Sequence, residues 1–97
     1  RRTKVLPNVP TFAEQGFPSI QASSWFAMYA PPKTAAVDID TLNRAVNKVL
    51  ALADVADRLL ALGLEVGGGS PGDLQRLMEV ESNRWGPVIR ASGFRAD

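Results

Sequence analysis

The sequence predicts an α/β fold with few strands and three to four helices, and three observations indicate this class. Residues 20–30 (IQASSWFAMYA) are rich in aromatic and apolar side chains without a helical stripe, which is typical of a strand. Apolar residues between positions 42 and 50 recur with the spacing of an amphipathic helix. Prolines and glycines divide the 97 residues into short segments of alternating type.

The opening segment, residues 1–10, combines three basic side chains with two prolines. Proline biases the preceding residue toward extended geometry, so we expect an irregular segment with at most a short strand at positions 4–6. The basic side chains could attract an anion, although most such runs are simply solvated. Thr11 and Glu14 then have the spacing of a capping box, and Gly16 fits the end of a helix. A single helical turn at 11–15 is predicted.

Residues 20–30 are predicted to form a strand that is covered on both faces, because their apolar residues do not alternate cleanly with polar ones. The Pro31-Pro32 pair ends this strand. The next segment predicts an amphipathic helix over about 38–53, capped by Asp38 or Asp40. Its apolar stripe consists of Leu42, Ala45, Val46, Val49 and Leu50.

Asp54 is predicted to begin a second helix, which Gly63 ends. Residues 64–66 have the apolar–polar–apolar pattern of a short strand, and three glycines form a turn after them. This turn could cradle an anion at a helix start, but it lacks the lysine of a phosphate-binding loop, so a capped turn is the simpler interpretation. Two or three strands make a thin sheet, which needs partner strands or self-association.

Ser70 and Pro71 are the N-cap and the first residue of a third long helix, and Gly93 ends it. Its apolar stripe includes Trp85, which we assign to the core. Pro87 lies inside the helix and removes one backbone hydrogen bond, so the sequence predicts a kink or a break there.

Composition excludes several functions. The chain has no cysteine and no histidine, which removes thiolate chemistry, histidine-based triads and the commonest zinc ligands. The acidic residues are placed as helix caps or solvated side chains, so we predict no catalytic residue, no metal site and no cofactor. A net charge of +1 gives no electrostatic footprint for nucleic acid. The sequence therefore indicates a protein that is not an enzyme.

Trp25 is the candidate binding residue, together with the adjacent Ser24. An aromatic ring beside small hydroxyl groups can line the pocket of a polar ligand. The alternative interpretation is that Trp25 packs in the core, and the residues alone leave both open.

The chain resembles, over nearly its whole length, the substrate receptors of tripartite tricarboxylate transporters, the Bug receptors. Residues 6–18 (LPNVPTFAEQGFP) are similar to the LPDVPTxAExGxP stretch of this family. One departure follows Pro32, where Lys33-Thr34-Ala35 replaces the family's usual Gly-Thr-Pro. Four further stretches are similar to family segments: residues 24–31, 42–50, 54–63 and 70–94.

The resemblance implies the C-terminal part of a periplasmic-binding-protein-like (type II) fold with two lobes. Residues 1–19 would end the second lobe, 20–30 would form a hinge or core strand, and 31–97 would return to the first lobe. Family members are about three times longer, so we expect a fragment that binds little ligand by itself. Ser24 and Trp25 become the candidate ligand contacts near the cleft.

The implied function is capture of a small carboxylate outside the cytoplasm, in the periplasm, and its delivery to membrane transporter subunits by lobe closure. The alternative is an independent small α/β module that self-associates, as a homodimer, by exchanging strands or helices. A small hydrolase is a third interpretation, which no catalytic constellation supports.

Overall fold

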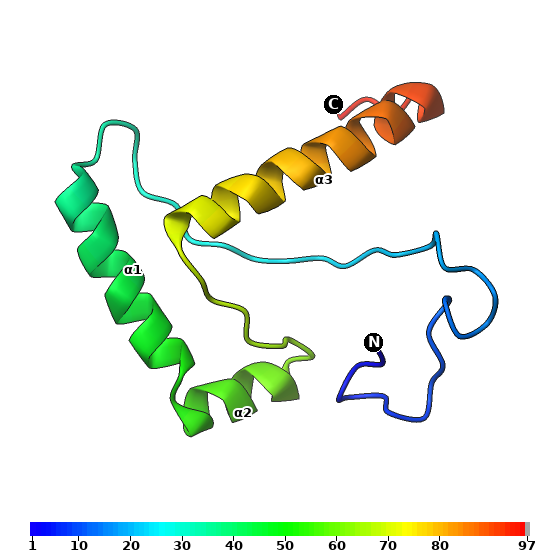
Figure 1. The fold of residues 1–97 in the computed structure, drawn as a ribbon, viewed down its shortest axis with the longest axis horizontal. Helices are drawn as coiled ribbons and strands as arrows, with labels where there is room; N and C mark the ends of the chain where they lie inside the picture. The colour runs from blue at the N-terminus through cyan, green and yellow to red at the C-terminus, as the bar shows by residue number, and fades with distance from the viewer. Residues whose placement is uncertain (97) are drawn as a thin grey trace.

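The computed structural model describes residues 1–96, which contain three α-helices joined by extended segments and turns (Figure 1). Helix α1 spans Ala36–Leu50, α2 spans Ala53–Ala61 and α3 spans Pro71–Ser92. All three lie close to the predicted ranges, because the apolar periodicity that specifies a helix is local to each segment. The helical turn predicted at 11–15 is also present, although it is too short to count as a helix.

The start of α1 differs from the prediction. Its N-cap residue is Ala35, which has no side chain able to accept a hydrogen bond, and neither Asp38 nor Asp40 caps the helix. Asp38 lies in the first turn instead. Its carboxylate is still favourable there, because the unpaired N–H groups at a helix start carry partial positive charge.

Both predicted ends of α3 are confirmed. Ser70 accepts a hydrogen bond from the Asp73 backbone N–H, the Asp73 side chain bonds back to Ser70, and Gly93 ends the helix with a φ of +71°. A kink or a break was predicted at Pro87, and the break is wrong, because α3 continues through this residue. Gly86 gives a physical reason: a residue before proline is disfavoured in a helix partly through its Cβ, and glycine has none.

The predicted α/β class is wrong for this chain, since residues 1–96 contain no strand. Residues 20–30 run extended through the middle of the molecule, in cyan in Figure 1. A strand, however, also requires hydrogen bonds to a neighbouring strand, and this segment has none within the described residues. Aromatic and β-branched side chains favour extended backbone there but cannot supply the missing partner.

The two shorter predicted strands are replaced by turns and coil. At positions 4–6, the Leu6 N–H donates to the Thr3 carbonyl at 3.3 Å and closes a turn. After α2, the Leu64 N–H donates to the Leu59 carbonyl at 2.9 Å, which satisfies the end of the helix rather than a sheet. Gly63 allows this with a φ of +79°.

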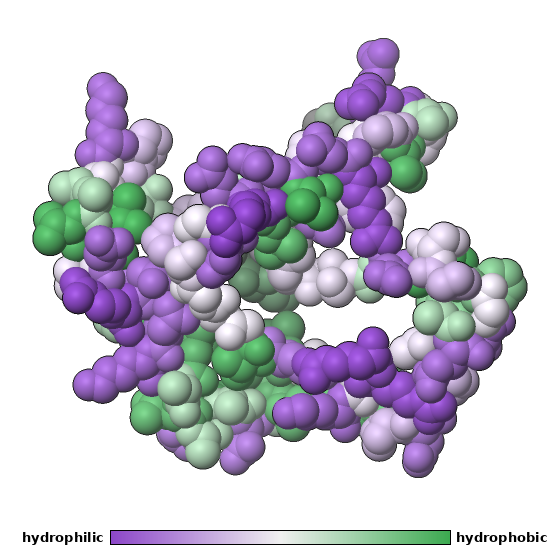
Figure 2. Space-filling view, in the orientation of Figure 1, coloured by the Kyte–Doolittle hydropathy of each residue, from purple (hydrophilic) through white to green (hydrophobic). Residues whose placement is uncertain are grey.

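The molecule is open. Helix α1 contacts α2 and α3, whereas α2 and α3 do not contact each other. No side chain among residues 1–96 is buried. The Cα radius of gyration is 16.7 Å, compared with about 13 Å for a compact chain of this length. Figure 2 shows apolar surface over α2 and the adjoining end of α1, and an open gap within the molecule.

The exposed area supports the same conclusion. The accessible surface is 8402 Å², whereas a compact monomer of this mass exposes about 5,400 Å². The difference, about 3,000 Å², shows that these helices do not complete a core by themselves. None of the described helices is both long enough and apolar enough to cross a membrane.

Candidate functional site

The turn that precedes the extended segment is closed at both ends. The Thr11 hydroxyl accepts from the Glu14 N–H at 3.2 Å, and the Glu14 carboxylate accepts from the Thr11 N–H at 2.7 Å. This confirms the predicted capping box. At the other end, the Phe17 N–H reaches the Phe12 carbonyl at 2.8 Å, and Gly16 has a φ of +91°. A hydrogen bond of this kind, with a left-handed glycine before its donor, also ends many longer helices.

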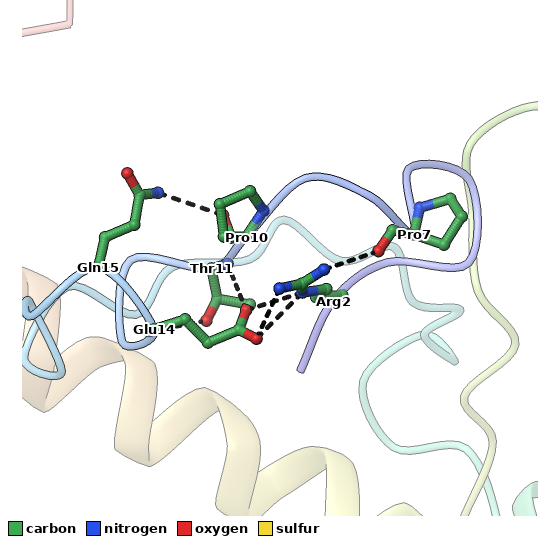
Figure 3. Close-up of polar contacts among 6 residues, drawn as sticks. All are labelled: Arg2, Pro7, Pro10, Thr11, Glu14 and Gln15. Carbon is green, nitrogen blue, oxygen red and sulfur yellow. Dashed lines mark hydrogen bonds and ion pairs between the residues drawn. The ribbon is translucent and has the colours of Figure 1, made fainter.

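Arg2 fixes this turn to the opening segment (Figure 3). Its Nε lies 3.0 Å from both carboxylate oxygens of Glu14, and its Nη1 donates to the Pro7 carbonyl at 3.2 Å. The hydrogen bond from Arg2, and next the backbone N–H of Thr11, lower the pKa of Glu14 to about 2. Glu14 raises the pKa of Arg2 in turn. Arg2 therefore pairs with a carboxylate of the same chain.

A second ion pair ties the start of the chain to the segment after α2. Arg1 Nη2 lies 2.6 Å from Glu65 Oε2, and the Lys4 backbone N–H donates to Glu65 Oε1 at 3.3 Å. A shallow cavity lies beside this pair, lined by Arg1, Lys4, Ala56, Asp57, Leu60, Leu64, Glu65 and Val66. Both arginines of the opening segment thus pair with carboxylates of the same chain. They do not form a separate site for an anion.

The two candidate binding residues lie on the extended segment, away from that cavity. Trp25 exposes 37% of its surface, while the adjacent Phe26 exposes 84%. Trp25 is therefore the more shielded ring of the pair, but it is not buried as a core residue would be. Ser24 is exposed. Among residues 1–96, no charged side chain forms a hydrogen bond with Ser24 or Trp25.

A polar cluster that the sequence analysis missed joins α1 to the start of α3. Asn47 Nδ2 donates to the Gly69 carbonyl and Asn47 Oδ1 accepts from the Gly69 N–H, each at 2.9 Å. Asn43 Nδ2 donates to the same carbonyl at 2.8 Å. The signal was present as two asparagines one helical turn apart, but both lie outside the apolar stripe, and the pattern does not show what a polar position contacts.

Trp85 is not a core residue, contrary to the prediction. It exposes 36% of its surface, and its indole Nε1–H donates to Glu81 Oε2 at 2.8 Å. The Arg84 guanidinium lies 5.4 Å from the centre of the indole ring, within the range of a cation–π contact. Helical spacing explains this cluster, because Glu81 and Trp85 are four residues apart and share one face.

The residues of the described chain include no group of three or more potential ligands placed to hold a metal ion. What the structure offers is hydroxyl, amide and indole donors on exposed backbone segments. Such groups can hydrogen-bond a polar ligand, and they do not activate a nucleophile.

Comparison with known proteins identifies the family. The sequence profile described as "Tripartite tricarboxylate transporter family receptor" matches residues 1–94. The chain therefore belongs to this family. Its members are solute-binding receptors, so the prediction that the chain is not an enzyme is confirmed.

Individual relatives agree with this assignment. A UPF0065 protein from the tcbD–tcbE intergenic region of Pseudomonas sp. (strain P51) is 38% identical over 85 residues, which is 87% of this chain and 25% of that protein. Protein BugT of Bordetella pertussis is 36% identical over 94 residues, 97% of this chain and 29% of BugT. A UPF0065 protein of Pseudomonas knackmussii is 31% identical over 85 residues, 87% of this chain and 50% of that protein.

The chain thus spans a quarter to a half of the length of these curated relatives. No solved structure matches it significantly.

Proposed function

We propose that the chain is the C-terminal portion of a periplasmic receptor that captures small carboxylates and delivers them to the membrane subunits of a tripartite transporter. One observation carries this proposal: the match to the receptor family is continuous over residues 1–94. The family description names tricarboxylates, and an open-chain carboxylate needs hydrogen-bond donors rather than a catalytic group. The chain's hydroxyl and indole donors suit such a ligand.

The portion is proposed to divide at the extended segment. Residues 1–19 belong to the end of the second lobe, 20–30 connect the lobes as a hinge, and 31–97 return to the first lobe. The structure supports this division because residues 20–30 separate the capped turn around Thr11 from the three helices without helical structure of their own. Remaining segments of a longer receptor would cover the apolar surface that these helices expose.

Ser24 and Trp25 are proposed to contact the ligand from this hinge segment. A hydroxyl and an indole N–H are both donors that a carboxylate accepts. The partial shielding of Trp25, compared with Phe26, supports a ring that lies at the edge of a site rather than in free solvent. Their position between the proposed lobes is where a closing receptor surrounds its ligand.

A calorimetric titration tests whether the chain needs the rest of a receptor. The 97-residue chain is titrated with tricarboxylates, dicarboxylates and amino acids. We expect no binding at micromolar concentration, because two side chains on an open segment do not enclose a ligand. Micromolar binding would contradict the requirement for further segments.

A chimaera tests the ligand contacts directly. The chain replaces the 94-residue part of BugT that it matches, and the same ligand panel is measured. Trp25→Phe removes one donor and keeps an aromatic ring, so affinity is expected to fall about tenfold for one lost hydrogen bond to a charged group. Trp85→Phe is the matched control, because it makes the same change on α3. Equal effects of the two substitutions would contradict the assignment of Trp25.

A second candidate function, self-association as an independent small module, is favoured by one observation. The chain exposes about 3,000 Å² more surface than a compact monomer of its mass. A second copy could cover part of this surface, and α3 is the longest helix that it could pack against.

A further inference from the structure

One carboxylate joins the two parts of the chain that the extended segment separates. Arg1 Nη2 lies 2.6 Å from Glu65 Oε2, and the Lys4 backbone N–H donates to Glu65 Oε1 at 3.3 Å. Among the described residues, no other hydrogen bond or ion pair connects positions 1–19 with positions 31–96. Both polar contacts between the two parts therefore end on Glu65, one on each oxygen.

The extended segment does not fix how the two parts sit relative to each other. Within the described chain, residues 22–30 take part in no hydrogen bond. Extended backbone without such bonds limits how far apart its ends can lie, but it leaves their orientation free. The orientation of residues 1–19 relative to the helices therefore depends on contacts outside this segment.

Packing where the two parts meet is incomplete. The opening segment faces α2 and residues 64–66 across a shallow cavity, with Arg1 and Lys4 on one side and Leu60 and Leu64 on the other. A cavity lacks the dispersion contacts that a packed junction would supply. The side chain of Glu65 is only 29% exposed, so solvent screens its bonds less than those of a fully exposed pair.

Each side of the junction is held within its own part. Glu65 follows Leu64, whose N–H closes the end of α2 on the Leu59 carbonyl at 2.9 Å, so Glu65 moves with the helices. On the other side, Arg2 bonds Glu14 and so ties the opening segment to the capped turn. Figure 1 shows the N-terminus beside the end of α2, where the two parts meet.

We propose that Glu65 is a latch between the two lobes of the receptor, an inference that rests on the proposed function for the division into lobes. With both bonds made, Glu65 holds the opening segment and the capped turn against α2. Without them, the two parts swing about residues 20–30. Loss of one exposed ion pair shifts such an equilibrium about fivefold.

A distance between two spin labels measures the latch, and the absence of natural cysteine makes the labelling specific. The labels are attached at Ala13→Cys and Ala61→Cys, two exposed alanines on either side of the junction. We expect Glu65→Gln to lower the ratio of held to released molecules about fivefold and to broaden the distances. Asp57→Asn is the matched control. It removes the same charge from the wall of the same cavity, but Asp57 makes no bond to the opening segment, so the distances should not change.

Charge reversal separates a lost latch from a disturbed fold. Arg1→Glu alone should release the two parts, and adding Glu65→Arg exchanges the partners of the pair. We expect partial recovery, because an arginine at position 65 cannot accept from the Lys4 N–H. Circular dichroism checks that each chain keeps its helices. Distances that are the same with and without Glu65→Gln, or no recovery in the reversed chain, would overturn the latch.

The outcome is independent of the ligand, because the distances are measured without one. A failed latch would leave carboxylate capture standing, since the chimaera with BugT tests that function separately. A chimaera that binds no carboxylate would instead reject the receptor function, while the measured distances would still show whether Glu65 joins the two parts.

Discussion

The side-chain amide of Asn47 makes two hydrogen bonds to the backbone of one residue, Gly69, with both donor–acceptor distances at 2.9 Å. The amide donates to the carbonyl and accepts from the N–H, as an adjacent peptide group in a sheet would. Gly69 directly precedes the N-cap of α3, so this pair fixes where α3 begins relative to α1. Because no side chain among residues 1–96 is buried, such polar contacts between elements hold the arrangement more than packing does.

Asn47→Ala is expected to release the start of α3 from α1. Three hydrogen bonds are lost, two to Gly69 and one to the Asn43 carbonyl. Each contributes about 0.5–1.5 kcal/mol, while alanine regains about 0.6 kcal/mol of helix propensity. Hydrogen exchange of the Gly69 amide is the direct measurement, and we expect it to become faster by an order of magnitude. Lys48→Ala, at the adjacent exposed position, is the control and should leave this amide unchanged. Unaltered protection in Asn47→Ala would contradict the role of the pair.

Gly68→Ala is expected to disturb the same contact from the other side. Gly68 has a φ of +94°, and a Cβ there would lie 2.7 Å from Asn47 Oδ1. The left-handed conformation alone costs a residue with a side chain about 1–2 kcal/mol. Gly67→Ala is the matched control, because a Cβ at Gly67 meets nothing within 4 Å. Urea unfolding followed by circular dichroism should separate the two variants; equal midpoints would refute this account.

Glu14 is expected to titrate far below an ordinary glutamate. Its folded pKa is about 2, compared with 4.5 normally, because Arg2 and the Thr11 N–H bond the ionised form. A lowered pKa means that the carboxylate stabilises the turn above pH 4.5 and loses this effect as the pH falls toward 2. Nuclear magnetic resonance of the Glu14 carboxyl carbon measures the midpoint directly.

Arg2→Gln tests whether Arg2 causes the low pKa of Glu14. Removing the guanidinium should raise the Glu14 pKa toward its ordinary value, although the Thr11 bonds keep it somewhat below. Arg1→Gln is the control, since Arg1 pairs with Glu65 instead. Because the Arg2–Glu14 pair is exposed, high salt should also weaken it. A Glu14 titration midpoint that stays unchanged in the Arg2→Gln chain would show that another group lowers the pKa.

The sequence predicted those features that depend on near neighbours. The capping box at Thr11, the N-cap at Ser70 and the end of α3 at Gly93 are present, because each needs only residues within one or two turns. The strands were mispredicted because a strand depends on a partner elsewhere in space. Trp85 was misplaced for a related reason: a stripe shows which face is apolar but not whether anything covers it.

The candidate site was less predictable than the helices. Ser24 and Trp25 were selected by residue type, and the structure places them on an extended segment without enclosing walls. The Asn43 and Asn47 contacts were missed because amphipathic patterning counts asparagine simply as polar. A polar residue directed at another element's backbone is indistinguishable, in a single sequence, from one directed at water.

Lys33→Gly is expected to stabilise the turn before α1. Lys33 has a φ of +66° and follows Pro32, and the Thr34 N–H closes the turn on the Pro31 carbonyl at 3.3 Å. Proline followed by a left-handed residue is the pattern of a type II turn, which prefers glycine at the second of its two central positions. We expect a gain of about 1 kcal/mol in unfolding free energy by thermal denaturation. Lys33→Ala keeps a Cβ and should gain nothing; an equal gain would attribute the effect to the lysine side chain.

Gly86 is expected to be what permits Pro87 inside α3, and a double-mutant cycle tests this. With Pro87 present, Gly86→Ala adds a Cβ that opposes the helical conformation before proline, so helix content should fall. With Pro87→Ala as the background, the same Gly86→Ala change should raise it, because alanine is favoured over glycine by about 1 kcal/mol in a helix. The new Cβ would lie 3.3 Å from the flexible end of Arg90, which can move aside. Circular dichroism of the four chains measures the reversal of sign, and the same sign in both backgrounds would show that α3 tolerates Pro87 for another reason.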